Sequence, residues 1–88
     1  MKLVKITVDI SCAYIGKPPV YRVYVDSELL TERTFTWDSQ TQYIKEHIQV
    51  NLSPGVHWLT LEQVDETAVF TLSNMQVDGV ASATKFYV

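Results

Sequence analysis

Apolar and polar residues alternate along most of the chain with a period of two, which indicates β-strands. Val4, Ile6, Val8 and Ile10 fall on one face of a first strand, and the residues between them are polar. The same alternation recurs in six later stretches: 20–26, 29–37, 42–52, 56–63, 68–77 and 84–88. Seven strands with short connections predict an all-β fold, an antiparallel β-sandwich or jelly roll, in a single domain spanning residues 1–88.

Proline, asparagine and glycine mark the places where the alternation breaks. Pro18 and Pro19 cannot both lie inside a hydrogen-bonded ladder, so they separate the first two strands. At Asn74 the apolar positions shift from even to odd numbers, which predicts a β-bulge. Asp78 and Gly79 form a dipeptide that is typical of tight turns, so the sixth strand ends before them.

One stretch also fits a helix. In residues 40–48, Tyr43 and His47 have i,i+4 spacing, as do Ile44 and Ile48. The β-branched residues on either side favour a strand, which is the interpretation adopted for 42–52.

Two charged residues occupy positions where the alternation favours apolar side chains. Arg33 shares its face with Leu29 and Phe35, and Glu46 shares its face with Ile44. If 29–37 and 42–52 form a hairpin around the loop 38–41, the numbers of opposed residues sum to 79. Arg33 then lies directly opposite Glu46.

Opposed side chains in an antiparallel pair have Cβ atoms about 4.5 to 5.5 Å apart. That distance permits a bidentate contact between a guanidinium and a carboxylate. We therefore expect Arg33 and Glu46 to form an internal ion pair that fixes the strand register. The alternative is that Glu46 is a catalytic carboxylate, but an acid already paired with arginine is a poor proton donor.

The neighbouring connections can be treated in the same way. A three-residue loop, Asp26 to Glu28, would pair Val25 with Leu29. A turn over residues 53–56 would pair Leu52 with His57. The sequence thus predicts three consecutive hairpins whose apolar faces match.

Composition and charge narrow the class of protein. The 88 residues include seven Lys/Arg and ten Asp/Glu, with a net charge of −3 and no basic run, so nucleic-acid binding is not expected. The alternating N-terminus does not have the pattern of a signal peptide. No stretch approaches the roughly 18 consecutive apolar residues of a membrane span. We expect a soluble protein that is made in the cytoplasm and binds no membrane.

The small size of the chain points to a partner. A chain of this length buries only about 60 to 65% of its unfolded surface, so self-association or docking onto a protein partner would add stability. Cys12 is the only cysteine, which excludes an internal disulfide and a cysteine metal site.

Few residues offer catalytic chemistry, and we do not expect an enzyme. His47 and His57 fall on opposite faces of adjacent predicted strands, which disfavours a shared metal. His57 is instead expected to cap the core beside the 53–56 turn. The three glycines do not form a phosphate-binding loop.

Acidic residues in predicted turns give one cofactor candidate. Asp26, Glu28, Asp65 and Glu66 could supply oxygen ligands to calcium. Because acidic residues are also ordinary turn formers, the expectation is no cofactor, with calcium as the open alternative.

The aromatic residues give the clearest functional signal. Core positions are predicted for Tyr21, Phe35, Phe70 and one of Phe86 and Tyr87. Tyr24, Tyr43 and Trp58 fall on outward positions, where a solvent-exposed sheet face normally carries polar groups. Exposed aromatic side chains suit a protein interface or stacking on sugar rings, although loops and chain ends could also cover them.

Three segments carry a resemblance: PPVYRVYVDSELLTERTFTW, YIKEHIQVNLSPGVHWLTLE and FTLSNMQVDGV. They resemble a group of short proteins encoded by marine tailed bacteriophages, particularly cyanophages. The resemblance implies a virion-associated or accessory role, as a capsid decoration, neck or tail component. The pattern that leads from VYVD into LLTE is also similar to small calcium-dependent carbohydrate-binding modules of the xylan-binding type, which implies glycan binding.

Together these observations predict a non-enzymatic binding or structural module. The first expectation is a small phage virion or accessory protein that docks through an aromatic sheet face or through loops. Its binding surface is expected to consist of Tyr24, Tyr43 and Trp58. The alternative is a carbohydrate-binding module in which these rings stack on sugars and turn acids hold calcium.

Overall fold

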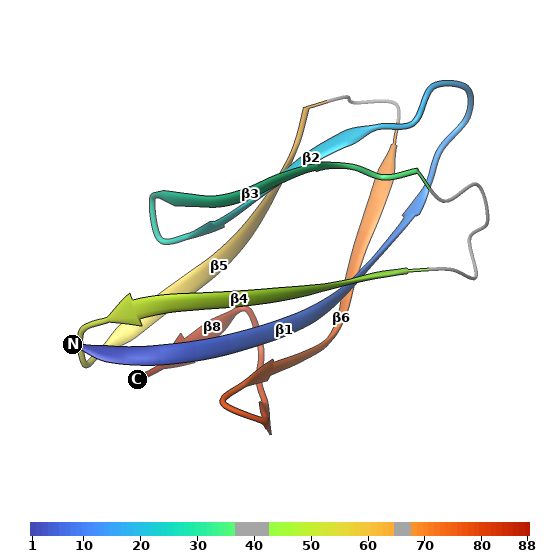
Figure 1. Ribbon diagram of the computed structural model, residues 1–88. Helices are drawn as coiled ribbons and strands as arrows, with labels where there is room; N and C mark the ends of the chain where they lie inside the picture. Colours follow the sequence, from blue (N-terminus) through green and yellow to red (C-terminus); the bar gives the residue numbers. More distant parts are fainter. Residues whose placement is uncertain (37–42, 65–67) are drawn as a thin grey trace.

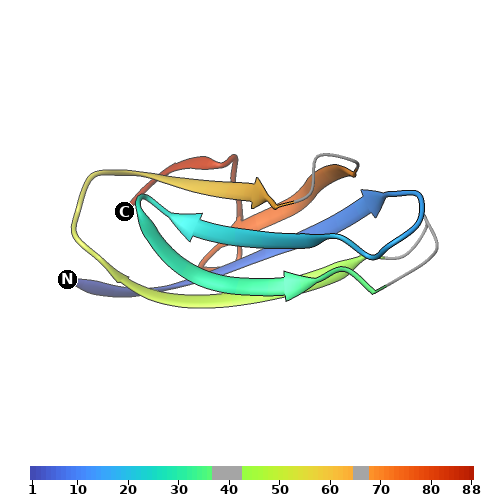
Figure 2. The same ribbon diagram turned by 90° about the horizontal axis from the view of Figure 1, so that it is seen from above.

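The protein is a sandwich of two β-sheets, as the alternation predicts (Figures 1 and 2). The computed structural model describes residues 1–36, 43–64 and 68–88, which contain strands and no helix. The strands are β1 (Lys2–Ala13), β2 (Val20–Val25), β3 (Glu28–Thr34), β4 (Ile44–Leu52), β5 (Val56–Gln63), β6 (Val69–Val77), β7 (Val80–Ala81) and β8 (Lys85–Tyr87). These eight strands are one more than the seven predicted from the sequence. The additional strand is β7, which has only two residues and is therefore too short to show an alternating pattern.

Each sheet has four antiparallel strands, in the orders β4-β1-β6-β7 and β3-β2-β5-β8. The chain moves back and forth between the sheets, so that β1 pairs with both β4 and β6, and β2 pairs with both β3 and β5. This nested pairing is typical of a jelly roll. Both chain ends lie at the same end of the sandwich (Figures 1 and 2).

Of the three predicted hairpins, only the one between β2 and β3 is present. Residues of β4 pair with β1, so Val50 lies opposite Val4 and not opposite Leu29. Residues of β5 pair with β2, so Leu59 lies opposite Val25. The predicted pairings of β4 with β3 and β5 were wrong because alternation fixes only the inward face of a strand. The inward face is buried equally well whether two consecutive strands pair in one sheet or lie in opposite sheets of the sandwich.

The β2–β3 hairpin has a tighter turn than predicted. Val25 pairs with Glu28, and the predicted loop of three residues is replaced by Asp26 and Ser27. The register shifts between Val23 and Tyr24, so Val23 pairs with Thr31, which is the partner that the three-residue loop would also have given it. Asp26 has a φ of 56°, a left-handed conformation that aspartate tolerates in tight turns.

The predicted bulge and turn in the C-terminal part are confirmed. Asn74 has a φ of 51°, and the pairing of β6 with β1 shifts register between Thr7 and Asp9. Asp78 and Gly79 have φ values of 51° and 81°, as a two-residue turn of type I′ requires, and they connect β6 to β7. The helical alternative is wrong for residues 44–48, which belong to β4, and residues 40–42 lie outside the described residues.

The core lies between the sheets and is built from the inward faces that the alternation identifies. Inward residues of the central strands β1 and β2 have almost no exposed surface: Val4, Ile6, Val8, Ile10, Tyr21, Val23 and Val25. The predicted aromatic core is confirmed, with Phe35 fully buried and the Phe70 ring 5.4 Å from that of Tyr21 in an edge-to-face arrangement. Phe86 is the buried member of the C-terminal pair, and Tyr87 is exposed.

Candidate functional site

Exposed apolar side chains gather on the outer surface of the β3-β2-β5-β8 sheet. Val56 of β5 pairs with Tyr87 of β8, and Trp58 pairs with Lys85. Because directly paired residues point to the same side of a sheet, these four side chains lie together. They are called the Trp58 face below. Trp58 is 51% exposed and Tyr87 is 69% exposed, which are large fractions for aromatic residues.

The local sequence explains why these residues point outward. His57 and Leu59 of β5 are buried, so Trp58 between them must face solvent. In β8 the buried residue is Phe86, and its neighbours Lys85 and Tyr87 therefore face outward. The Lys85 Nζ atom lies 5.4 Å from the centre of the Trp58 ring, a cation–π contact that places a positive charge beside the aromatic group.

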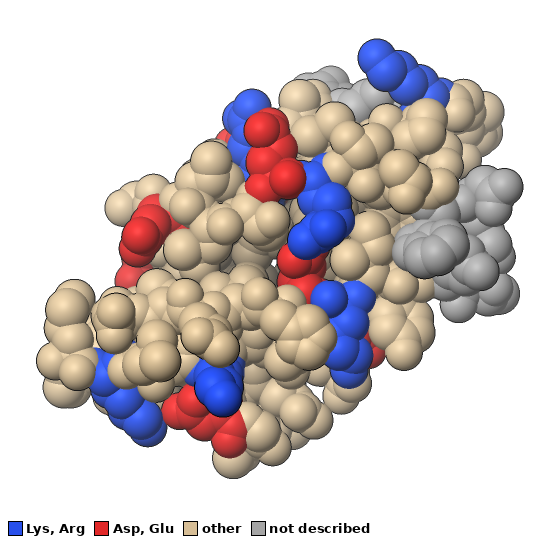
Figure 3. Space-filling model, viewed as in Figure 1, with Lys and Arg blue, Asp and Glu red and all other residues tan. Residues whose placement is uncertain are grey.

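A row of polar groups continues this outer surface along β2 and β5. The Arg22 guanidinium bridges Glu32, at 2.9 Å, and Glu62, at 3.1 Å. The Tyr24 side chain is partly buried, and its hydroxyl donates to Glu62 at 3.4 Å, so this tyrosine belongs to the polar row. In the view of Figure 3, acidic and basic side chains alternate and do not form a patch of one sign.

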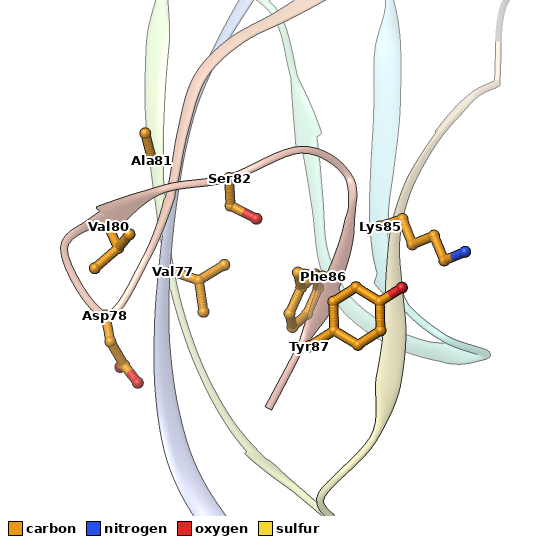
Figure 4. A pocket seen from close by; sticks show the side chains of 8 residues that line it. All are labelled: Val77, Asp78, Val80, Ala81, Ser82, Lys85, Phe86 and Tyr87. Carbon is orange, nitrogen blue, oxygen red and sulfur yellow. The ribbon is translucent and has the colours of Figure 1, made fainter.

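A shallow pocket of about 360 Å³ adjoins the Trp58 face, at the corner where β6, β7 and β8 meet (Figure 4). Its lining residues are Val77, Asp78, Val80, Ala81, Ser82, Lys85, Phe86 and Tyr87. Lys85 and Tyr87 belong to both the pocket and the Trp58 face, so the two form one continuous surface. Figure 4 shows the Lys85 side chain extended over β5, away from Val77 and Ser82.

The three aromatic residues predicted to form a binding surface do not lie together. Tyr24 and Trp58 are on the outer surface of the same sheet. Tyr43 directly precedes β4, in the other sheet, and is exposed there. Tyr87, which the alternation left as one of two core candidates, takes the place beside Trp58. Sequence parity could have placed Tyr87 outward only if Phe86 had first been assigned to the core.

Arg33 and Glu46 do contact each other, but the contact spans the two sheets. The Arg33 Nε atom lies 2.6 Å from Glu46 Oε1, and Nη2 lies 3.3 Å from Oε2. The Tyr21 hydroxyl also donates to Oε1, at 2.6 Å. The Glu46 side chain is 4% exposed and that of Arg33 is 49% exposed, so the carboxylate is buried beneath a guanidinium that reaches solvent.

The surroundings of this cluster shift the pKa of both donors upward. Burial, and then the hydrogen bond to Glu46, raise the pKa of Tyr21. The hydrogen bond to Glu46 raises the pKa of Arg33. Both groups therefore stay protonated and keep donating to the carboxylate. The cluster holds the two edge strands β3 and β4 together across the core, and no part of this geometry suggests proton transfer.

His57 caps the core beside the β4–β5 connection, where the sequence placed it. Its Nδ1 atom lies 2.7 Å from Asp26 Oδ2, and its Nε2 atom lies 2.7 Å from the Ser53 carbonyl oxygen. The other Asp26 oxygen accepts a hydrogen bond of 3.0 Å from the Trp58 backbone N–H. These contacts raise the pKa of His57, first through Asp26, and lower the pKa of Asp26, first through His57.

The proposed calcium ligands are not assembled in the described part of the chain. Both carboxylate oxygens of Asp26 are engaged by His57 and Trp58. Glu28 begins β3, and Asp65 and Glu66 lie outside the described residues. Within residues 1–36, 43–64 and 68–88, no group of three or more His, Cys, Asp or Glu side chains could hold a metal ion.

Within the same residues, no helix has the length and apolarity needed to cross a membrane. Comparisons of the chain with protein-family models, with curated proteins and with solved structures found no match.

Proposed function

We propose that the protein is a non-enzymatic binding module that docks onto a protein partner through the Trp58 face and the adjoining pocket. The observation that carries this proposal is the continuous surface on which exposed Trp58 and Tyr87 flank Lys85. Tryptophan and tyrosine are prominent in the binding energy of protein interfaces, because these large rigid side chains lose little conformational freedom on burial. The Arg22–Glu62 row beside this surface would serve as its polar rim.

The polar groups of the pocket support binding more than catalysis. Asp78 accepts a hydrogen bond from the Lys5 backbone N–H and forms an ion pair with Lys2. The Ser82 hydroxyl donates to the Ala83 carbonyl oxygen at 3.0 Å. A general base or nucleophile needs a partner that activates it, and these groups are instead held by structural contacts.

The resemblance to short cyanophage proteins supplies the biological setting of the proposal. In that setting the partner is a capsid, neck or tail protein, and the chain is a virion or accessory component. A surface with both charge signs and exposed aromatic groups suits attachment to another folded protein.

A glycan is the second candidate ligand, and one observation favours it. Trp58 and Tyr24 lie on the same outer sheet surface as Arg22 and Glu62, whose charged groups can hydrogen-bond to hydroxyls. Aromatic rings beside polar groups can bind a sugar through stacking and directed hydrogen bonds. The polar row is already internally paired, which is why a protein partner comes first.

Binding to purified marine cyanophage particles, measured by co-sedimentation, tests the proposal. We expect Trp58→Ala and Tyr87→Ala to weaken binding at least about 30-fold, as hot-spot residues do. Tyr43→Ala, on the other sheet, should bind like the unmodified chain. A glycan array is run in parallel. Glycan binding that Trp58→Ala abolishes would favour the second candidate, and binding to neither target, or binding indifferent to Trp58, would refute the use of this surface.

A further inference from the structure

The strand β6 has a long free edge. On one side it pairs with β1 from Val69 to Val77. On the other side, β7 pairs only with Gln76 and Val77, and the Ser82 N–H donates to the Met75 carbonyl. In the described part of the chain, no strand lies beside residues 69–74 on that side. Backbone groups along this edge are therefore available to pair with another strand.

The edge strands β3 and β4 and the uncovered part of β5 carry charged residues, whereas the free part of β6 does not. The edge strand β4 carries Lys45 and Glu46, and the edge strand β3 carries Glu32 and Arg33. The part of β5 that β8 leaves uncovered carries Glu62. The strand β6 has the sequence VFTLSNMQV, with no charged residue, proline or glycine. Natural proteins use charged residues and proline to block edge pairing, so the absence of both marks β6 as a pairing site.

Apolar side chains beside this edge are incompletely covered. Phe70 and Leu72 point toward the core and pack against it, yet both are only partly buried. Ile10 of β1, which pairs with Leu72, is fully buried because β1 has a strand on both sides. A strand added to the β6 edge would cover Phe70 and Leu72 on the side where they lack a neighbour.

We propose that the free edge of β6 pairs antiparallel with the same edge of a second copy of this chain, forming a two-fold homodimer. With the two-fold axis at Thr71, Phe70 of one copy lies opposite Leu72 of the other, and Val69 lies opposite Ser73. Apolar residues then meet on the inward side, and the two Thr71 side chains meet on the outward side. Such pairs are favourable across antiparallel strands.

A second copy is the occupant that the edge itself specifies. A two-fold axis perpendicular to the sheet makes two identical edges antiparallel and keeps inward residues inward on both strands. An uncharged edge can pair with itself without repulsion. The bulge at Asn74 and the cover by β7 restrict the pairing to about five residues, so the dimer is small and depends on protein concentration. This edge is in the sheet opposite the Trp58 face, and the inference does not rest on the proposed docking function.

Sedimentation velocity over a concentration series tests the dimer. Thr71→Lys places two like charges directly opposite each other at the axis, and Thr71 is exposed in the single chain, so folding should be retained. We expect the dissociation constant to rise at least about tenfold. Thr34→Lys is the matched control, because Thr34 is an exposed threonine at the end of the other sheet's edge strand β3. It should dimerise like the unmodified chain.

Charge complementation separates pairing from an indirect effect on folding. Thr71→Glu alone should also be monomeric, because two carboxylates then meet at the axis. An equimolar mixture of Thr71→Lys and Thr71→Glu should recover a dimer, since opposite charges are now directly paired. Hydrogen exchange should show that those backbone amides of residues 69–73 that point away from β1 become protected as the concentration rises.

Several results would overturn the proposal. The unmodified chain could stay monomeric at every concentration, or Thr71→Lys could dimerise as well as the unmodified chain. An equal loss in Thr34→Lys, protection confined to another strand, or failure of the mixture to recover a dimer would also count against pairing at β6.

Discussion

At the scale of single residues, the carboxylate of Glu46 is buried in the core and depends on hydrogen-bond donors. Two charge-assisted or hydroxyl donors, Arg33 and Tyr21, compensate its desolvation. The net contribution of such a cluster to stability can be small, because the cost of burying charge offsets the attraction. Removing one partner is different, since it leaves the carboxylate buried and incompletely paired.

Arg33→Ala should therefore lower the free energy of unfolding by about 2 to 3 kcal/mol. This value is at the upper end of the range of about 1 to 3 kcal/mol that is typical when a buried acceptor loses its partner. The value for a fully buried ion pair would be larger, but half of the Arg33 side chain is in solvent. Urea unfolding followed by circular dichroism measures this change.

The control for this prediction is Arg22→Ala. Arg22 also bridges two carboxylates, but both are on the surface, where solvent screens the attraction, so the loss should be much smaller than that of Arg33→Ala. Equal and small losses in the two variants would show that Glu46 does not need its guanidinium.

At the scale of elements, the sequence predicted the positions of the strands well but predicted poorly which strands pair with each other. Alternation located the six main strands to within a few residues in the described part of the chain, and Asn74 and Asp78-Gly79 identified the bulge and the turn. The pairing of strands could not be predicted, because two consecutive strands with matching inward faces can either form a hairpin in one sheet or lie in opposite sheets. Arg33 and Glu46 still meet because they lie at similar distances from the connection between two stacked edge strands.

The His57 contacts join three elements: β5, the β2–β3 turn through Asp26, and the β4–β5 connection through Ser53. Both partner atoms are acceptors, so only the doubly protonated ring can donate to both. The folded-state pKa of His57 is raised above its ordinary value of 6.5, so its contribution is complete below pH 6.5 and is lost as the pH rises through the raised pKa. That of Asp26 is lowered below 3.8, so its contribution is lost only in acid.

We expect the melting temperature to decline as the pH rises from 6 to 9, and His57→Gln to abolish this decline while lowering the value at pH 6. Thermal melts at a series of pH values measure both effects. His47→Gln is the control, because His47 is exposed on β4 and should leave the alkaline decline intact. A decline of equal size in His57→Gln would assign the titration to another group.

At the scale of the whole molecule, the candidate site was only partly predictable. Outward parity identified Trp58 and Tyr24, which do share a sheet surface. It also grouped Tyr43 with them, although Tyr43 belongs to the opposite sheet, and it left Tyr87 undecided. The even or odd position of a residue in a strand predicts whether its side chain points away from the core, whereas the strand order determines which outward side chains lie close together. That information resides in long-range pairing, which a period of two does not encode.

The same topology separates the two surfaces that the proposals use. The Trp58 face lies on the outer surface of one sheet, and residues 69–73 of the β6 edge lie in the other sheet. The pocket beside the Trp58 face reaches β6 only at Val77. Substitutions at well-separated sites usually change the free energy of unfolding additively, to within about 0.5 kcal/mol. Trp58→Ala should cost about 0.5 to 1 kcal/mol, for its exposed contact with Lys85. Thr71→Lys should change stability by less than about 0.5 kcal/mol in the monomer.

The double variant should therefore lose the sum of the two single losses in urea unfolding, measured at a concentration that keeps every chain monomeric. It should also lose docking and dimerisation together, while each single variant loses only one. A coupling above about 1 kcal/mol would mean that the two sheets transmit strain to each other. Effects on partner binding could then no longer be assigned to one surface. Additive losses would establish that this small sandwich can carry two independent contacts on one core.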